Sequence, residues 1–100
     1  MTIAKRKLVT IITESALELS LIDDFERLGV RGYTITNARG KGHRGARGAD
    51  WSTSSNIRIE VVCSVQVAEA VVEHLKEHYY RDYAMVLFMN DVEVTRPEKF

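Results

Sequence analysis

The chain is 100 residues long, with 45% apolar residues and with 14 basic side chains matched by 14 acidic ones, so its formal net charge is zero. A neutral body gives no general reason to bind nucleic acid, and the single cysteine, Cys63, excludes an intrachain disulfide. Because the sequence shows neither a signal-peptide core at its N-terminus nor an apolar run of about 18 residues, we expect a single cytoplasmic domain over residues 1–100.

The first half of the chain predicts a strand, a helix and a second strand. The β-branched run over residues 8–13 is typical of a strand that is buried on much of both faces. Ser15 followed by Glu18 forms a capping box, and it predicts a helix that ends at Gly29. The helix separates an apolar face from a face turned to water, with Leu17, Leu21, Phe25 and Leu28 on the first and Glu14, Glu18, Asp24 and Arg27 on the second. Alternation over residues 33–38 predicts the second strand.

The second half predicts a strand, a helix and a further strand. Residues 56–63 alternate clearly, and Ser64 can cap the helix that follows. The apolar stripe of this helix consists of Ala68, Val71 or Val72, Leu75 and Tyr79. Residues 83–89 are apolar without a break and predict a strand. The Asn90–Asp91 pair then predicts a turn before a short extra strand over residues 92–95, and Pro97 ends regular structure.

The order of these elements predicts an α+β fold. A βαββαβ order is typical of the ferredoxin-like arrangement, in which a four-stranded antiparallel sheet carries both helices on one face. The strand at residues 83–89 is nevertheless apolar on both sides, so the second face of the sheet must also be covered. We expect copies of the same chain to pack these faces around a symmetry axis.

The segment from residue 39 to residue 48 is the most unusual part of the chain, because it contains four of the six glycines and four of the 14 basic side chains. It separates two predicted strands, where a turn of about two to five residues would suffice. Residues 37–50 carry four basic side chains against one acidic one, a net charge of +3, which leaves −3 for the rest. A local positive site on a neutral body suits a small anion better than a long polyanion.

Glycine and basic residues alternate here in a way that suits a phosphate. Gly40 and Gly42 flank Lys41, so the backbone can present N–H groups beside an ammonium group. Arg44 and Arg47 are three residues apart, and each planar guanidinium can hold a phosphate through two hydrogen bonds. We therefore expect a phosphate-binding loop that is disordered without ligand and partly ordered with it.

Several short stretches, none of them specific alone, match a known family when they are taken in order and at their spacing. The matching residues are Gly32, Tyr33 and Thr34, Asn37, Gly40, Lys41 and Gly42, Arg44 and Arg47, residues 56–60, Tyr83 and Ala84, and Glu93 and Val94. With these residues the chain resembles the PII signal-transduction superfamily. It is most similar to the PII-like regulators of bicarbonate transport, including the SbtB type and the carboxysome-associated PII proteins.

The resemblance implies a homotrimer of ferredoxin-like domains in which residues 39–55, the T-loop, lie at clefts between subunits. It implies that each cleft binds an adenine nucleotide, ADP or AMP ahead of ATP and cyclic AMP, with bicarbonate as a further ligand and with no required cofactor or metal. The residues expected at the ligand are Gly40, Lys41, Gly42, Arg44 and Arg47 of the loop, together with Thr34, Asn37, Arg58 and Arg96.

The resemblance also implies a regulatory function rather than an enzymatic one. The T-loop would present one conformation to a bicarbonate transporter or a carboxysome-associated protein, and would so regulate bicarbonate uptake or carboxysome function. No serine, histidine and acid are spaced to suggest a catalytic group. Nucleic acid is not expected as a partner, because the strand at residues 56–63 lacks stacking aromatic side chains.

Several interpretations stay open. A trimeric CutA-like metal-tolerance protein has the same fold, and a small nucleotide hydrolase would bind the same ligands. His74 and His78 are four residues apart, which is a spacing for two metal ligands, although exposed helix positions explain them as well. Arg58 could form an inter-subunit ion pair with Glu60 instead of binding a ligand, and Arg96 could simply be solvated.

Overall fold

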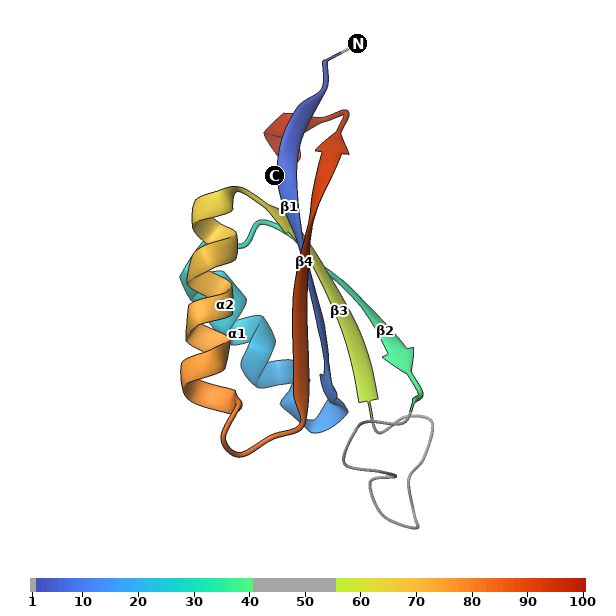
Figure 1. The fold of residues 1–100 in the computed structure, drawn as a ribbon, viewed down its shortest axis with the longest axis vertical. Helices are drawn as coiled ribbons and strands as arrows, with labels where there is room; N and C mark the ends of the chain where they lie inside the picture. The colour runs from blue at the N-terminus through green and yellow to red at the C-terminus, as the bar shows by residue number, and fades with distance from the viewer. Residues whose placement is uncertain (1, 41–55) are drawn as a thin grey trace.

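The computed structural model describes residues 2–40 and 56–100, and these form an α+β fold with two layers (Figure 1). Their helices and strands follow each other in the predicted order. The strands are β1 (Ala4–Glu14), β2 (Thr34–Ala38), β3 (Asn56–Cys63) and β4 (Met85–Val94), and the helices are α1 (Glu18–Leu28) and α2 (Val65–Tyr79). Short 3₁₀ turns at Ser15–Leu17 and Pro97–Lys99 precede α1 and follow β4.

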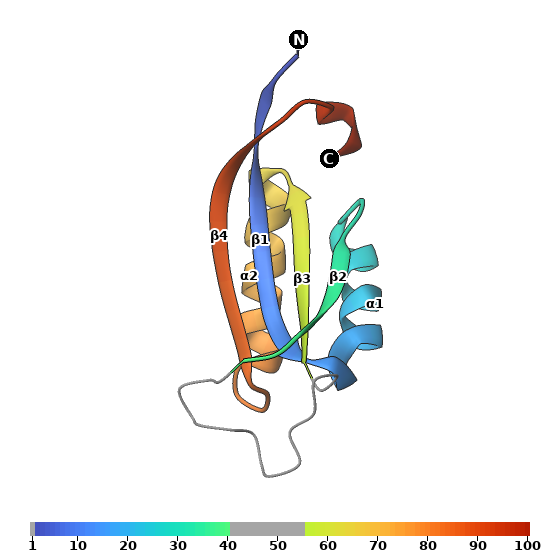
Figure 2. The same cartoon turned by 90° about the vertical axis from the view of Figure 1, so that its right-hand side faces the viewer.

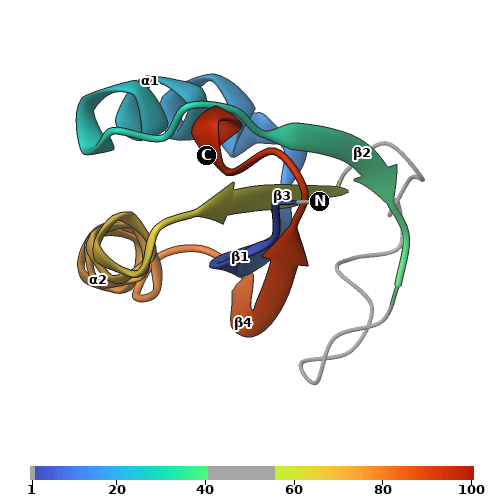
Figure 3. The ribbon, with the colours of Figure 1, turned by 90° about the horizontal axis from the view of Figure 1, so that it is seen from above.

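The strands of the described residues form one antiparallel sheet in the order β2-β3-β1-β4. Both helices lie on the same face of this sheet, which is clearest when the molecule is seen from above (Figure 3). This arrangement confirms the predicted ferredoxin-like fold. The sheet is centred on β1, in which Ile11 lies between Ile59 of β3 and Leu87 of β4.

The hydrophobic core lies between the sheet and the two helices. Its fully buried members come from alternate positions of β1 and β3 and from the predicted stripes of the helices: Val9, Ile11, Ile57, Ile59, Val61, Leu21, Phe25, Ala68, Val71 and Leu75. The alternation of β3 and the helical periodicity of α2 are therefore confirmed, and Val71 rather than Val72 faces the core. Cys63 is buried in the same core, and burial raises the pKa of its thiol.

The two helices begin differently. Ser64 caps α2 as predicted, because its hydroxyl accepts a hydrogen bond from the backbone N–H of Val67 at 3.2 Å. The capping box predicted for α1 is wrong, since Ser15 lies in a 3₁₀ turn and α1 begins at Glu18 without a side-chain cap. The reason is that Glu14, the last residue of β1, occupies the extended position before the turn, and its carboxylate accepts from Ala84 instead of capping the turn. Gly29 ends α1 with a φ of 88°, as predicted.

Two acidic residues that were expected to face water are partly buried instead. The carboxylate of Glu14 accepts a hydrogen bond from the backbone N–H of Ala84 at 3.0 Å. The side chain of Asp24 is only 12% exposed, because it lies between α1 and α2 and contacts residues of α2. The amphipathic pattern of α1 could not show this, because it contains no information on where the second helix lies.

The predicted turn at Asn90–Asp91 is also wrong, because β4 runs through it without interruption. The reason is that β1 begins at Ala4, earlier than expected, and gives these residues pairing partners. Asp91 lies opposite Lys7, and the lysine Nζ lies 2.6 Å from the aspartate Oδ1. The residues predicted as a separate final strand thus belong largely to β4, and the ends of β1 and β4 extend the sheet as a two-stranded ribbon (Figure 2).

The face of the sheet opposite the helices exposes large apolar side chains, as the sequence predicted. Val86 is 53% exposed and Phe88 is 43% exposed, and their neighbours in register on β1 are Ile12 and Thr10. We call this surface the outer face. An exposed apolar surface in the middle of a sheet is typical of a surface that packs on another molecule.

Candidate functional site

The long loop leaves the sheet at one end, which we call the loop end. Ala38 at the end of β2 pairs with Asn56 at the start of β3. The connection between α2 and β4 lies at the same end (Figure 2) and is fixed to β1 at Ala84. The Thr13 hydroxyl donates to the carbonyl oxygen of Ala84 at 2.8 Å, and the Glu14 carboxylate accepts from its N–H. The base of the loop therefore adjoins a firmly anchored connection.

Of the predicted loop residues, the structure describes Gly40 alone. It follows β2, and a methyl group at its Cα would meet no atom within 4 Å. Its backbone is thus accessible to a ligand, although no steric clash requires glycine there. Four further predicted residues lie outside the described part of the chain, namely Lys41, Gly42, Arg44 and Arg47. The expectation that the loop orders on binding also falls outside it.

The predicted residues of the sheet do not all share one face. Thr34 pairs with Glu60 and lies on the outer face together with Arg58. Asn37 pairs with Ile57 and lies on the side of the helices, where its position on an edge strand leaves it exposed. One ligand molecule could contact both Thr34 and Asn37 only by reaching around the β2 edge.

Arg58 and Glu60 form an ion pair within the chain. The Nη2 of Arg58 lies 3.3 Å from the Oε2 of Glu60, and both side chains are more than 40% exposed. Exposed pairs of this kind contribute little to stability. The alternative that Arg58 of one subunit pairs with Glu60 of another stays a prediction.

Thr10 of β1 lies opposite Glu60 in the sheet. It is fully buried, and its hydroxyl has no hydrogen-bond partner in the described part of the chain.

Arg96 follows β4, whose C-terminal end lies at the opposite end of the sheet from the loop end (Figure 1). β4 begins beside Thr13 at the loop end and finishes beside Ala4. Its ten residues span roughly 30 Å at the usual rise of a strand. A single chain therefore cannot place Gly40 and Arg96 on one small ligand. The two residues can meet only if the loop end of one chain adjoins the C-terminal end of another.

The C-terminal end of the sheet contains an open groove of about 300 Å³. Its lining consists of Glu93, Val94, Thr95, Arg96, Lys99 and Phe100. Two distant arginines hold the 3₁₀ turn beside it. The Nη2 of Arg6 donates to the carbonyl oxygen of Pro97 at 3.2 Å, and the Nη1 of Arg31 donates to the carbonyl oxygen of Glu98 at 3.0 Å. Sequence reasoning missed Arg31, because only the fold brings the α1–β2 connection to this end.

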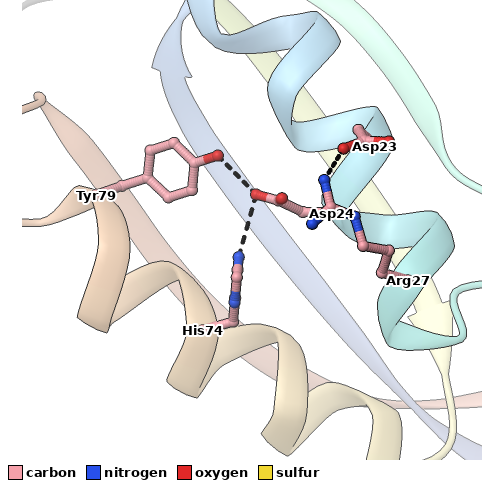
Figure 4. A network of polar contacts seen from close by, with 5 residues as sticks. All are labelled: Asp23, Asp24, Arg27, His74 and Tyr79. Carbon is pink, nitrogen blue, oxygen red and sulfur yellow. Dashed lines mark hydrogen bonds and ion pairs between the residues drawn. The ribbon is translucent and has the colours of Figure 1, made fainter.

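The helix layer contains a polar network centred on the carboxylate of Asp24 (Figure 4). The hydroxyl of Tyr79 donates to Asp24 Oδ2 at 2.6 Å, and the Nε2 of His74 lies 3.2 Å from the same oxygen. Burial, followed by the hydrogen bond to Asp24, raises the pKa of Tyr79 above its usual range. Because Tyr79 ends α2, this network fixes the start of the α2–β4 connection.

Two further polar features of the described residues lie on α2. The rings of His74 and His78 lie with their centroids 4.3 Å apart and their planes tilted by 43°, and no group of three metal-ligating side chains is found in residues 2–40 and 56–100. A larger groove of about 580 Å³ lies between α2 and β4, and its lining includes Glu69, Glu73 and Glu77. Three glutamates disfavour a phosphate there. No helix in the described ranges is long and apolar enough to cross a membrane.

Comparison with known proteins gives consistent matches over nearly the whole chain. The family model described as nitrogen regulatory protein P-II matches residues 6–99. A solved structure from Thermus thermophilus, named for its likeness to PII signalling proteins, is 45% identical, with a TM-score of 0.85 over 100% of this chain and 99% of that one.

Two structures of CPII, a nitrogen regulatory PII-like protein from Thiomonas intermedia, are also similar. The first, with ADP, AMP and bicarbonate bound, is 27% identical with a TM-score of 0.85, over 99% of this chain and 96% of that chain. The second, with ADP and bicarbonate bound, is 28% identical with a TM-score of 0.87, over 99% and 97%.

Proposed function

Because this chain belongs to the nitrogen regulatory protein P-II family, we propose that it is a PII-like signalling protein that binds an adenine nucleotide in clefts between subunits. ADP and AMP are the favoured ligands, and bicarbonate is a further one. The observation that carries this proposal is the likeness, over nearly the full length of both chains, to a PII-like protein with ADP, AMP and bicarbonate bound.

The separation of Gly40 from Arg96 supports a cleft between subunits rather than a pocket within one chain. Residues of the loop end would contact the ligand from one subunit, and Arg96 would contact it from the next. A head-to-tail contact of this kind closes into a ring when the rotation fits. The homotrimer expected for the family is such a ring, and the exposed Val86 and Phe88 offer an apolar surface for its centre.

Within this cleft we assign the phosphates to the loop. Lys41, Gly42, Arg44 and Arg47 would surround them together with the backbone of Gly40. Each contact between a guanidinium and a phosphate contributes about 1.5–3 kcal/mol as a charged hydrogen bond, which offsets the entropy lost when loop residues become ordered. Bicarbonate would share the same guanidinium groups as a second small anion.

The regulatory step in this proposal is a change in T-loop conformation. A nucleotide that binds one loop conformation more tightly than another increases the population of the first. A partner that binds only one of the two conformations then binds more or less of the protein, depending on the nucleotide. The partner we propose is a bicarbonate transporter or a carboxysome-associated protein, so that the signal regulates inorganic-carbon uptake or carboxysome function.

Calorimetric titration with AMP, ADP, ATP and cyclic AMP tests the binding. ADP or AMP should bind most tightly, and bicarbonate should strengthen that binding by the same factor by which the nucleotide strengthens binding of bicarbonate, because the coupling of two ligands is reciprocal. The proposal is wrong if none of the four nucleotides binds at millimolar concentration. A phosphate-release assay on the same samples distinguishes a regulator, which leaves ATP and ADP intact, from a nucleotide hydrolase.

A further inference from the structure

Arg31 occupies an unusual place for an exposed basic residue. It lies between the end of α1 and the start of β2, yet its Nη1 donates to the carbonyl oxygen of Glu98, 67 residues further along the chain. A guanidinium group carries five N–H donors, and this contact uses one of them. The carbonyl acceptor is neutral, so Arg31 is held in place without an anionic partner there.

The C-terminal 3₁₀ turn that Arg31 contacts also borders a groove with basic side chains, although Arg31 itself is not among the residues that line it. Arg96 and Lys99 line the groove of about 300 Å³ beside the C-terminal 3₁₀ turn, and Phe100 adds an aromatic ring to its wall. Glu93 also lines the groove and offsets part of this positive charge, as does the nearby Glu98. The turn and its groove together bring four basic side chains, Arg6, Arg31, Arg96 and Lys99, to this end against Glu93 and Glu98, and no sequence motif marked Arg31 as one of them.

We infer that Arg31 is an anion-binding residue of the C-terminal half of the nucleotide site, and that it exchanges the carbonyl oxygen of Glu98 for a ligand phosphate. The inference rests on the proposed function and deepens it. A phosphate carries the opposite charge to the Arg31 guanidinium and can accept two parallel hydrogen bonds from it, whereas the carbonyl oxygen of Glu98 is neutral and accepts one, so a phosphate in reach of Arg31 displaces the carbonyl contact.

The exchange has a consequence for the C-terminal turn. Two arginines hold Pro97–Lys99 in the free chain, and only Arg31 leaves when the ligand binds. Arg6 keeps its contact with the carbonyl oxygen of Pro97, because it is half-buried at the base of the turn. Ligand binding therefore loosens one of two attachments and leaves the turn hinged on the other.

Arg31→Gln, studied by calorimetry in the full-length protein, tests this inference. We expect ADP binding to weaken about tenfold, as for one lost charged hydrogen bond, and binding of inorganic pyrophosphate to weaken likewise. Arg31→Lys keeps the charge and should recover part of the loss. Arg27→Gln is the matched control, because it removes an exposed arginine of α1 that pairs with Asp23 in the helix layer (Figure 4). It should bind as the unaltered protein does.

Hydrogen exchange at residues 97–100 supplies a second readout. Exchange at the amides of Lys99 and Phe100, which donate to Arg96 and Pro97, should quicken on ADP binding and in Arg31→Gln without ligand. If the unaltered protein binds ADP and Arg31→Gln binds it equally well, the inference is wrong and the proposed function stands. If the unaltered protein binds neither pyrophosphate nor any of the four nucleotides, both are wrong. Pyrophosphate binding alone, lost in Arg31→Gln, supports the anion site without the nucleotide.

Discussion

The two ends of the sheet are held together in different ways. At the loop end, shielded carboxylates make the key contacts, since Glu14 anchors the α2–β4 connection and Asp24 binds Tyr79 at the end of α2. At the C-terminal end, the exposed Arg31 and the half-buried Arg6 donate to backbone carbonyl oxygens of the turn, and an exposed Lys7–Asp91 pair joins the ribbon. The loop end is thus a firm base for a long loop, whereas the C-terminal end can exchange its contacts at small cost.

This difference suggests a division of labour within the proposed cleft. A firm base keeps the loop in register with the sheet while the loop itself changes conformation. An adjustable C-terminal end of the neighbouring subunit can close on whatever the loop has bound. Each chain carries both halves, but roughly 30 Å of β4 separates them, so neither half can act without a second chain.

The largest expected effect comes from separating the two halves by mutation. Arg44→Ala with Arg47→Ala should abolish measurable ADP binding, and Arg96→Ala should weaken it severely, because each removes charged contacts from one side of the cleft. When equal amounts of the two variants are unfolded together and refolded, trimers of both kinds of chain should form. If assembly is random, about a quarter of all clefts should combine an intact loop side with an intact C-terminal side. Calorimetry on the mixture measures this recovery.

No recovery in mixed trimers, confirmed as mixed by mass spectrometry, would mean that both sides come from one chain. That outcome would contradict the head-to-tail cleft even if the nucleotide binds. Each variant refolded alone in the same way is the control.

The firmness of the loop end can be tested by Tyr79→Phe. The change removes the hydroxyl that donates to Asp24 and leaves a mostly buried carboxylate short of one donor. We expect the free energy of unfolding to fall by about 1–2 kcal/mol. Urea denaturation measures it, and Tyr80→Phe, at an exposed position next to it, is the matched control. Equal stability of the two variants would show that the network does not brace this end.

The same network predicts a dependence on alkaline pH. The pKa of Tyr79 is raised in the folded chain, whereas an unfolded tyrosine titrates near about pH 10. The folded state therefore holds its proton longer than the unfolded state does. The protonated Tyr79 hydroxyl therefore contributes its full stabilisation below about pH 10, and this stabilisation is lost as pH rises further through the raised pKa of the folded chain. The ultraviolet tyrosinate signal that Tyr79→Phe removes should appear only well above that pH.

The smallest effect is expected at the C-terminal ribbon. The hydrogen bond from Lys7 lowers the pKa of Asp91. The pair therefore stabilises the folded chain at any pH above the ordinary pKa of an aspartate, about 3.9. This stabilisation is lost as pH falls through the lowered pKa that Asp91 has in the folded chain. Because the carboxylate is exposed, Asp91→Asn should shift the melting temperature only slightly at neutral pH. A shift as large as that of Tyr79→Phe would contradict the contrast between the two ends.

Sequence periodicity predicted the parts of the fold that depend on local pattern. Ile57 and Ile59 alternate with polar neighbours, and that alternation is enough to place them in the core. It failed where a distant segment decides the structure. The turn signal of Asn90 and Asp91 is overridden because Lys7 and Leu8 pair with these residues from the other end of the chain.

For the candidate site, the sequence marked candidate residues whose binding roles stay predictions. Glycine and charge marked the loop, and the strand order placed Gly40 at its base. The contacts of Asp24 and Arg31 were not predictable, because each is made with a residue that the fold brings from 55 and 67 residues away, respectively. Local sequence shows which residues are charged, but only the packing of the second helix and the C-terminal turn shows what those charges contact.

The central position of β1 also determines when the protein can fold. β1 is the first strand to be synthesised, yet one of its neighbours is β4, the last. Ala4 can therefore pair with Val94 only after nearly the whole chain has been synthesised. A nascent chain cannot complete its sheet until nearly all of it has left the ribosome. Such a high contact order slows folding, and β1 exposes an unpaired edge until the last strand arrives. Chains that stop before β4 should consequently aggregate rather than form a smaller domain.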